Sequence, residues 1–121
     1  MGYTRYWTRT DKPIDADLIC YVCKVIEDCN NKGIAIRNGV GTGNPIVTFE
    51  QITFNGDNSV DHDHETFSID KETGCQFCKT ARKPYDYAVR KVLRYAEEHG
   101  FVTEVSADGE NEDIVSDEEY N

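Results

Sequence analysis

The chain has no long apolar run, since its hydrophobic stretches are only a few residues in length. A helix that crosses a bilayer needs about 20 consecutive apolar residues, so we expect none. Residues 1–7 lack the apolar core and cleavage site of a signal peptide, and Tyr6 stands where a myristoylation signal requires Ser or Thr. We therefore expect a cytoplasmic protein. With 38% hydrophobic and 30% charged residues, its composition is that of a globular domain.

Basic residues are also scarce, because 13 Lys and Arg stand against 23 Asp and Glu, for a net charge of −10. Nonspecific binders of duplex DNA gain most of their affinity by neutralising phosphates, so this charge argues against such a function. Seven acids and no base lie in residues 107–121. Residues 110–121 hold only three apolar side chains, too few to offset the entropy of ordering them, so they predict a mobile acidic tail after a domain over 1–109.

Periodicity and turn residues predict two helices among several strands. Apolar residues recur every three or four positions in the two helical segments and tend to alternate in the strands. The Asn55-Gly56 turn predicts a hairpin with a long loop, and residues 70–83 are expected to be irregular. This order favours a single α+β domain, with a mainly antiparallel sheet of four to five strands and two helices on one face. The expected helices are 14–29 and 84–99, and the expected strands are 3–10, 34–36, 46–54, 65–69 and 101–105.

The cysteines form two pairs with metal-ligand spacing, Cys20-x-x-Cys23 and Cys75-x-x-Cys78. Four thiolates would close a structural zinc site. However, the pairs are about 50 residues apart, and Cys20 faces away from the apolar stripe of its helix. We therefore favour cysteines that act as small apolar residues, with no metal and no cofactor, and a reducing compartment disfavours disulfides.

An acidic run with two histidines, residues 61–65, is a second possible metal site. In an extended chain its histidines and acids would alternate between opposite faces, which is poor geometry for one metal ion. We favour a solvated acidic loop, with His64 and Glu65 retained as candidate functional residues.

A basic loop precedes the second helix and contains Lys79, Arg82 and Lys83. Unpaired N–H groups at a helix N-terminus attract anions, and these bases would add full positive charges. Tyr85 would stack on a base or donate its hydroxyl group. The alternative is that Asp86, in the first turn, already complements the helix dipole. In the first strand, Tyr6 lies on the face opposite Tyr3 and Trp7.

Five motifs together resemble a family of small uncharacterised proteins found in bacteriophages and in prophage-bearing bacterial genomes. They cover most of residues 2–109, and the run Phe77-Cys78-Lys79-Thr80-Ala81-Arg82-Lys83-Pro84-Tyr85-Asp86 is the most specific. The resemblance implies a phage-type origin and draws attention to Asn55, His64, Glu65, Lys79, Arg82 and Tyr85. In two places the chain departs from the family pattern: Arg5 replaces an expected His, and no Trp follows Asp108-Gly109. The other four motifs are Gly2–Trp7, Ile52–Gly56, His64–Phe67 and Val105–Gly109.

Three functions fit these observations. The favoured one is a phage protein that binds a phosphorylated or nucleotide-type small molecule, as would suit blocking a host defence signal. The second is an enzyme that acts on such a ligand, with Glu65 or His64 as the base and with Lys79 or Arg82 binding the oxyanion or phosphate. The third is an acidic protein that mimics nucleic acid and occupies a host DNA-binding protein. The expected ligand-binding residues are Asn55, His64, Glu65, Lys79, Arg82, Lys83 and Tyr85.

Overall fold

Strand β1 (Thr4–Arg9) lies at the centre of a sheet, between β5 (Gly74–Lys79) and β6 (Val102–Ala107). The computed structural model describes residues 3–108. Both neighbours run antiparallel to β1, so β5 and β6 are parallel to each other. Helix α2 (Asp86–Glu98) connects them, which makes β5-α2-β6 a split β-α-β unit with β1 inserted between its strands.

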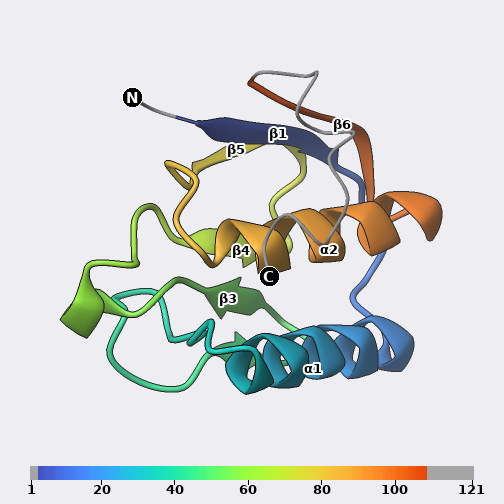
Figure 1. The fold of residues 1–121 in the computed structure, drawn as a ribbon. Coiled ribbons are helices and arrows are strands. Elements are labelled where there is room, and N and C mark those ends of the chain that lie inside the picture. Colours follow the sequence, from blue (N-terminus) through green and yellow to red (C-terminus); the bar gives the residue numbers. More distant parts are fainter. Residues whose placement is uncertain (1–2, 109–121) are drawn as a thin grey trace.

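A second, smaller antiparallel sheet lies on the side of the first sheet on which the two helices are found (Figure 1). Its strands are β2 (Ile46–Val47), β3 (Ile52–Phe54) and β4 (Phe67–Ile69), in that order. The long β3–β4 connection includes a short 3-10 helix, Asn58–Val60. Figure 1 shows α2 beneath the first sheet, and α1 (Ala16–Asn31) with the second sheet farther away.

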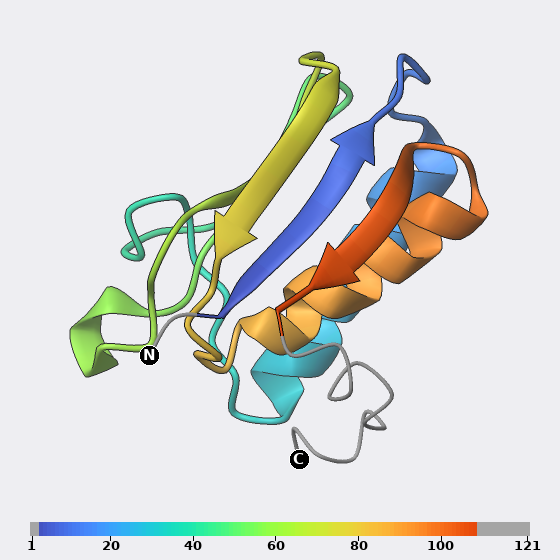
Figure 2. The ribbon, with the colours of Figure 1, turned by 90° about the horizontal axis from the view of Figure 1, so that it is seen from above.

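The core fills the space between these layers, on one face of the first sheet only. Helix α1 begins where the Asp15 carboxylate accepts a hydrogen bond from the Leu18 amide at 2.8 Å, and it buries residues three or four positions apart. Trp7 and Phe67 pack with ring centroids 5.3 Å apart, joining β1 to the second sheet. Among residues 3–108, no helix lies over the opposite face of the first sheet, and Figure 2 looks onto that face.

The prediction of an antiparallel α+β domain with two helices is confirmed. The strands are divided between two sheets, because β3 and β4 pair with each other and with β2 instead of joining the β1 sheet. The expected strand over 46–54 is interrupted by a turn, in which the Thr48 hydroxyl accepts from the Gln51 amide at 3.1 Å. Residues 34–36 do not form a strand, although Arg37 and Asn55 form an isolated bridge.

The expectation that residues 70–83 are irregular was wrong, because β5 occupies 74–79 and pairs with β1 along its whole length. Helix α2 starts at Asp86 and not at Pro84, since residues 81–85 form turns. The predicted acidic tail, residues 110–121, lies outside the described residues. Within residues 3–108, neither helix has the length and apolar composition needed to cross a bilayer.

Gly56 provides a test of the packing between the hairpin loop and α2. A Cβ atom at this position would lie 2.0 Å from the His62 carbonyl oxygen and 3.1 Å from the Tyr85 ring. Gly56→Ala should therefore lower the free energy of unfolding by about 3 kcal/mol or more, as severe overpacking does. Gly33→Ala is the matched control: its φ is +84° but it has open space, so only the left-handed strain of about 1 kcal/mol applies. Equal losses in urea denaturation would contradict this packing.

Candidate functional site

The uncovered face of the first sheet carries an exposed aromatic pair. Tyr6 of β1 and Phe77 of β5 are directly opposite each other in the antiparallel register, and they are 41% and 58% exposed. Side chains alternate along a strand, so Lys79 lies on the same face as Phe77, and Thr8 on the same face as Tyr6. The Tyr6 hydroxyl donates to Asp108 Oδ1 at 3.1 Å, which restrains its ring.

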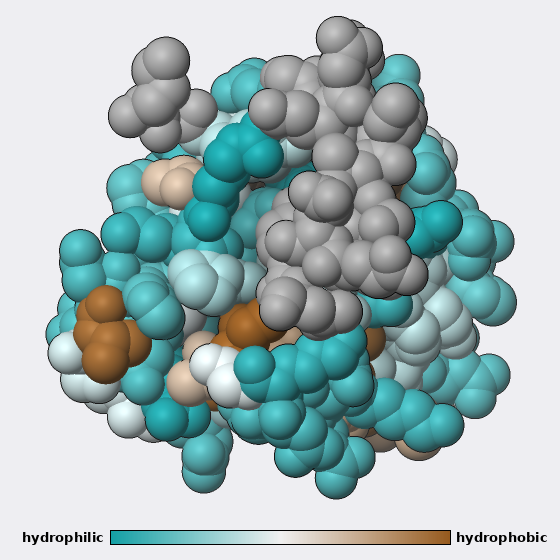
Figure 3. Space-filling view, in the orientation of Figure 1, coloured by the Kyte–Doolittle hydropathy of each residue, from teal (hydrophilic) through white to brown (hydrophobic). Residues whose placement is uncertain are grey.

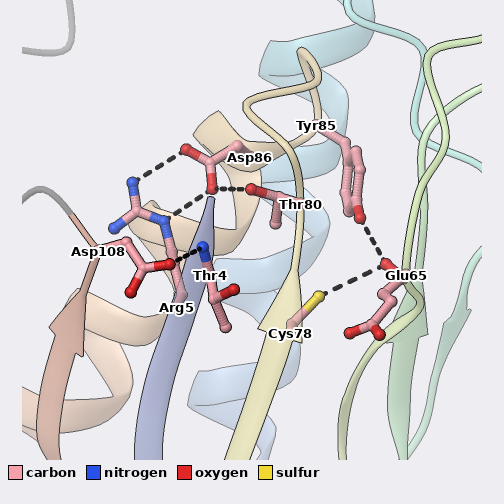
Figure 4. A network of polar contacts seen from close by, with 8 residues as sticks. All are labelled: Thr4, Arg5, Glu65, Cys78, Thr80, Tyr85, Asp86 and Asp108. Carbon is pink, nitrogen blue, oxygen red and sulfur yellow. Dashed lines mark hydrogen bonds and ion pairs between the residues drawn. The ribbon is translucent and has the colours of Figure 1, made fainter. Parts of the chain in front are cut away.

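On the covered face of β1, Arg5 forms an ion pair with Asp86 in the first turn of α2 (Figure 4). Arg5 Nε and Nη2 donate to the two Asp86 carboxylate oxygens at 2.8 and 2.9 Å, and the Thr80 hydroxyl adds a third bond at 2.7 Å. Arg5 is 3% exposed, and Thr80 and Asp86 are fully buried. In the sequence, Arg5 stands out as a departure from a family pattern, whereas its partner Asp86 is set by the packing of α2 on β1.

The turn between β5 and α2 is tightly hydrogen-bonded. The amides of Thr80 and Ala81 both donate to the Tyr3 carbonyl, at 3.0 and 3.1 Å. Ala81 and Arg82 adopt left-handed backbone conformations, with φ of 53° and 56°. Such conformations are costly for non-glycine residues, so the surrounding bonds must hold them in place.

The first N–H groups of α2 are already bonded within this turn. Asp86 N donates to the Lys83 carbonyl at 2.8 Å, Tyr87 N to Pro84 at 3.2 Å, and Ala88 N to Tyr85 at 2.9 Å. The Asp86 carboxylate also lies in the first turn, where it complements the dipole. These N–H groups, which the sequence hypothesis assigned to a bound anion, are therefore already used within the protein. The negative charge at the helix N-terminus is that of Asp86, as in the alternative interpretation.

Three of the expected site residues, Glu65, Lys79 and Tyr85, do meet. Glu65 bonds both backbone groups of Lys79: its Oε1 accepts from Lys79 N at 2.8 Å, and its own N–H donates to Lys79 O at 3.1 Å. The Glu65 carbonyl accepts hydrogen bonds from the Tyr85 hydroxyl and from Cys78 Sγ (Figure 4). Glu65 thus fixes the end of β5 and does not form an ion pair with the Lys79 side chain.

The side chains of Cys78 and Tyr85 are not activated as nucleophiles. Burial raises the pKa of the Cys78 thiol to about 12 and also raises the pKa of Tyr85. Both groups stay protonated at neutral pH, so neither is a ready nucleophile.

Asn55 is buried, and its side chain forms hydrogen bonds with backbone groups of the hairpin loop and of Gly39. Its amide nitrogen donates to the carbonyls of Gly39 and His64, and its oxygen accepts from the amides of Gly56 and His64. The His64 side chain is exposed.

Arg82 and Lys83 project from the turn before α2. The Arg82 guanidinium lies 4.0 Å from the centroid of the Tyr3 ring. The Lys83 ammonium donates to the Asp61 carbonyl at 2.8 Å, which ties the turn to the acidic loop. The seven expected residues therefore border one region without converging on one point.

Two hollows of the surface lie away from these residues. One of about 420 Å³ is next to α1 and is lined by residues such as Cys23, Ile26 and Val47. Another of about 300 Å³ lies by Arg9 and Phe49. None of the seven expected site residues lines either hollow.

The two Cys-x-x-Cys pairs belong to different elements, α1 and β5. Cys20, Cys23 and Cys75 are exposed, whereas Cys78 is buried. Within residues 3–108, no three His, Cys, Asp or Glu side chains are grouped so that they could hold a metal ion. The fifth cysteine, Cys29, is buried in α1, and burial raises its pKa to about 12.

These differences predict the reactivity of the thiols. In the native protein a maleimide reagent should modify Cys20, Cys23 and Cys75 within minutes and leave the two buried thiols intact. All five should react in denaturant. Mass spectrometry of labelled peptides distinguishes the groups, and rapid native labelling of Cys78 would show that the end of β5 is not packed as described.

The ion pair predicts a large loss of stability when one partner is removed. Arg5→Ala or Asp86→Ala should each lower the free energy of unfolding by about 3–5 kcal/mol, because the other charge stays buried without compensation. Arg5→Met with Asp86→Leu should recover part of the loss. Asp28→Ala removes an exposed pair with Lys32 and should cost less than about 1 kcal/mol. Equal effects of Arg5→Ala and Asp28→Ala in urea titrations would refute a central role for the buried pair.

Comparison of the chain with protein-family models, with curated proteins and with solved structures yields no match. The resemblance to small phage proteins therefore stays a prediction drawn from the motifs. A functional assignment must rest on the contacts, exposure and charges of the residues themselves.

Proposed function

We propose that this protein binds a phosphorylated, nucleotide-type small molecule on the uncovered face of the β5-β1-β6 sheet. The observation that carries the proposal is the exposed Tyr6–Phe77 pair, with Lys79 two residues beyond Phe77 on the same face of β5. Large aromatic side chains stabilise a fold when buried, so two of them side by side in solvent suggest a stacking surface. The surface visible in Figure 3 is largely hydrophilic, with only scattered apolar side chains.

The spacing along β5 suits a nucleotide. Phe77 and Lys79 are two residues apart on one face of a strand, which separates them by about 7 Å. This is comparable to the separation between a base and its own phosphate group. A base that stacks on Phe77 would thus place its phosphate near Lys79. Among the described residues, no acidic side chain forms an ion pair with Lys79.

The other side of the face favours one orientation of the ligand. Glu104 accepts a hydrogen bond from the Thr8 hydroxyl at 2.8 Å, and Asp108 accepts one from the Tyr6 hydroxyl at 3.1 Å. Carboxylates repel phosphate and accept hydrogen bonds from the amino groups of bases. We place the phosphate over β5 and the edge of the base toward β6.

Both strands of the proposed site are held rigidly before a ligand arrives. Lys79 is paired with Thr4 of β1 on one side and with the backbone of Glu65 on the other. A preformed site avoids the entropy cost of ordering on binding. Capture fits these features better than catalysis, because Cys78 and Tyr85 are buried with raised pKa values. In a phage-encoded protein acting in the host cytoplasm, such capture would remove a signalling nucleotide and so counter host defence.

Two substitutions test the site with adenosine 5′-monophosphate as the probe. Phe77→Ala and Lys79→Ala should each weaken its binding about tenfold or more in calorimetric titrations, because stacking on an aromatic ring and a phosphate contact are each worth at least that factor. Both side chains are exposed, so the melting temperature should change little.

Phe49→Ala and Lys24→Ala are matched controls, since Phe49 is 64% exposed and Lys24 is also exposed, both away from this face. Neither should change the affinity. The other nucleoside monophosphates are titrated in the same way. If none of them binds the native protein, or if the Phe77 and Lys79 variants bind as well as the controls, the proposal fails.

A further inference from the structure

We infer that the uncovered sheet face accommodates two successive nucleotides, so that the ligand class is a single-stranded dinucleotide. The inference rests on the proposed function and adds the number of bases that are bound. Tyr6 and Phe77 come from different strands, and each exposes its own ring. In antiparallel RNA-binding sheets, aromatic side chains on neighbouring strands stack two or three consecutive bases in this manner.

The register places Tyr6 and Phe77 directly opposite each other on neighbouring strands. Directly opposed residues of antiparallel strands have Cβ atoms about 5 Å apart, close enough for two neighbouring bases to use one ring each. The ring of Tyr6 is restrained by its hydrogen bond to Asp108. Because Lys79 is on the same strand as Phe77, the nucleotide with the 5′-phosphate stacks on Phe77, and the next base stacks on Tyr6.

The charges of the face limit the length of the ligand. Lys79 is positively charged and lies on the same face as Phe77, whereas Glu104 and Asp108 accept hydrogen bonds on the β6 side. A general single-strand binder gains affinity with each phosphate that it neutralises. On this face additional phosphates would approach carboxylates, so binding should not strengthen beyond two nucleotides.

The backbone at the end of β5 argues against a peptide strand as the occupant. A peptide that extends the sheet needs free N–H and C=O groups on the edge strand. Both backbone groups of Lys79 on that edge are already bonded to Glu65. A peptide therefore cannot extend the sheet at the Lys79 end of β5.

The test compares adenosine 5′-monophosphate, the 5′-phosphorylated dinucleotide pApA and the tetranucleotide pApApApA by calorimetry in one buffer of fixed ionic strength. We expect pApA to bind about tenfold tighter than the monophosphate, since each stacked base contributes at least about that factor. The tetranucleotide should bind within about twofold of pApA. Tyr6→Ala should bring the affinity for pApA to within about twofold of the affinity that the same variant has for the monophosphate.

Tyr6→Phe is the matched control, because it keeps the ring and loses only the hydroxyl bond to Asp108, so it should keep the advantage of pApA. If the monophosphate binds and pApA binds no tighter, the two-base inference is wrong although the proposed function stands. If neither binds, both are wrong. An advantage of pApA that persists in Tyr6→Ala, or an affinity that keeps rising with the tetranucleotide, would also overturn the inference.

Discussion

The buried ion pair between Arg5 and Asp86 fixes the position of the proposed binding face. Burying two charges costs desolvation energy, and this cost is recovered only when the geometry is good and the remaining hydrogen-bonding capacity is used. Both conditions are met here, with two bonds between the side chains and a third from Thr80. Thr80 directly follows Lys79, so one network joins β1, the end of β5 and the start of α2. A shift of α2 relative to β1 would move Lys79 together with the turn.

Strand β1 distributes its side chains in an unusual way. Its covered face buries Arg5 and Arg9 together with Trp7, while its uncovered face exposes Tyr6. The hydrophobic effect alone would favour an aromatic ring inside and a guanidinium outside. The buried arginines are accounted for by their hydrogen bonds, since Arg9 donates to the Asp70 and Phe101 carbonyls, at 2.9 and 3.1 Å. Burial does not account for the exposed Tyr6 ring, which is why we place the proposed ligand on the uncovered face.

The helices could be predicted from the sequence because their apolar stripes are local patterns of period 3.6. β5 could not, since Gly74-Cys75-Gln76-Phe77-Cys78-Lys79 alternates weakly and becomes a strand by pairing with β1. The same difference holds for the site. The motifs directed attention to Glu65, Lys79 and Tyr85, and Glu65 contacts both of the others. Their contacts depend on the turn before α2. Two residues of this turn, Ala81 and Arg82, are left-handed, whereas Gly, Asn and Asp are the residues that usually indicate such a turn in a sequence. With β5 assigned, the exposure of Phe77 beside Lys79 would have followed from alternation.

The acidic character of the chain and a site for an anionic ligand are compatible because the two act over different distances. At physiological ionic strength the Debye length is about 8 Å, so a phosphate on the sheet interacts mainly with charges in its immediate surroundings. Near Phe77 that surrounding includes Lys79, and across the sheet it includes Glu104 and Asp108. A ligand with one or two phosphates can keep them all on the β5 side, whereas a long strand cannot. The net charge of −10 therefore opposes long polyanions far more than short ones. A protein with this surface could remain selective for a small nucleotide in a cell that is full of RNA and DNA.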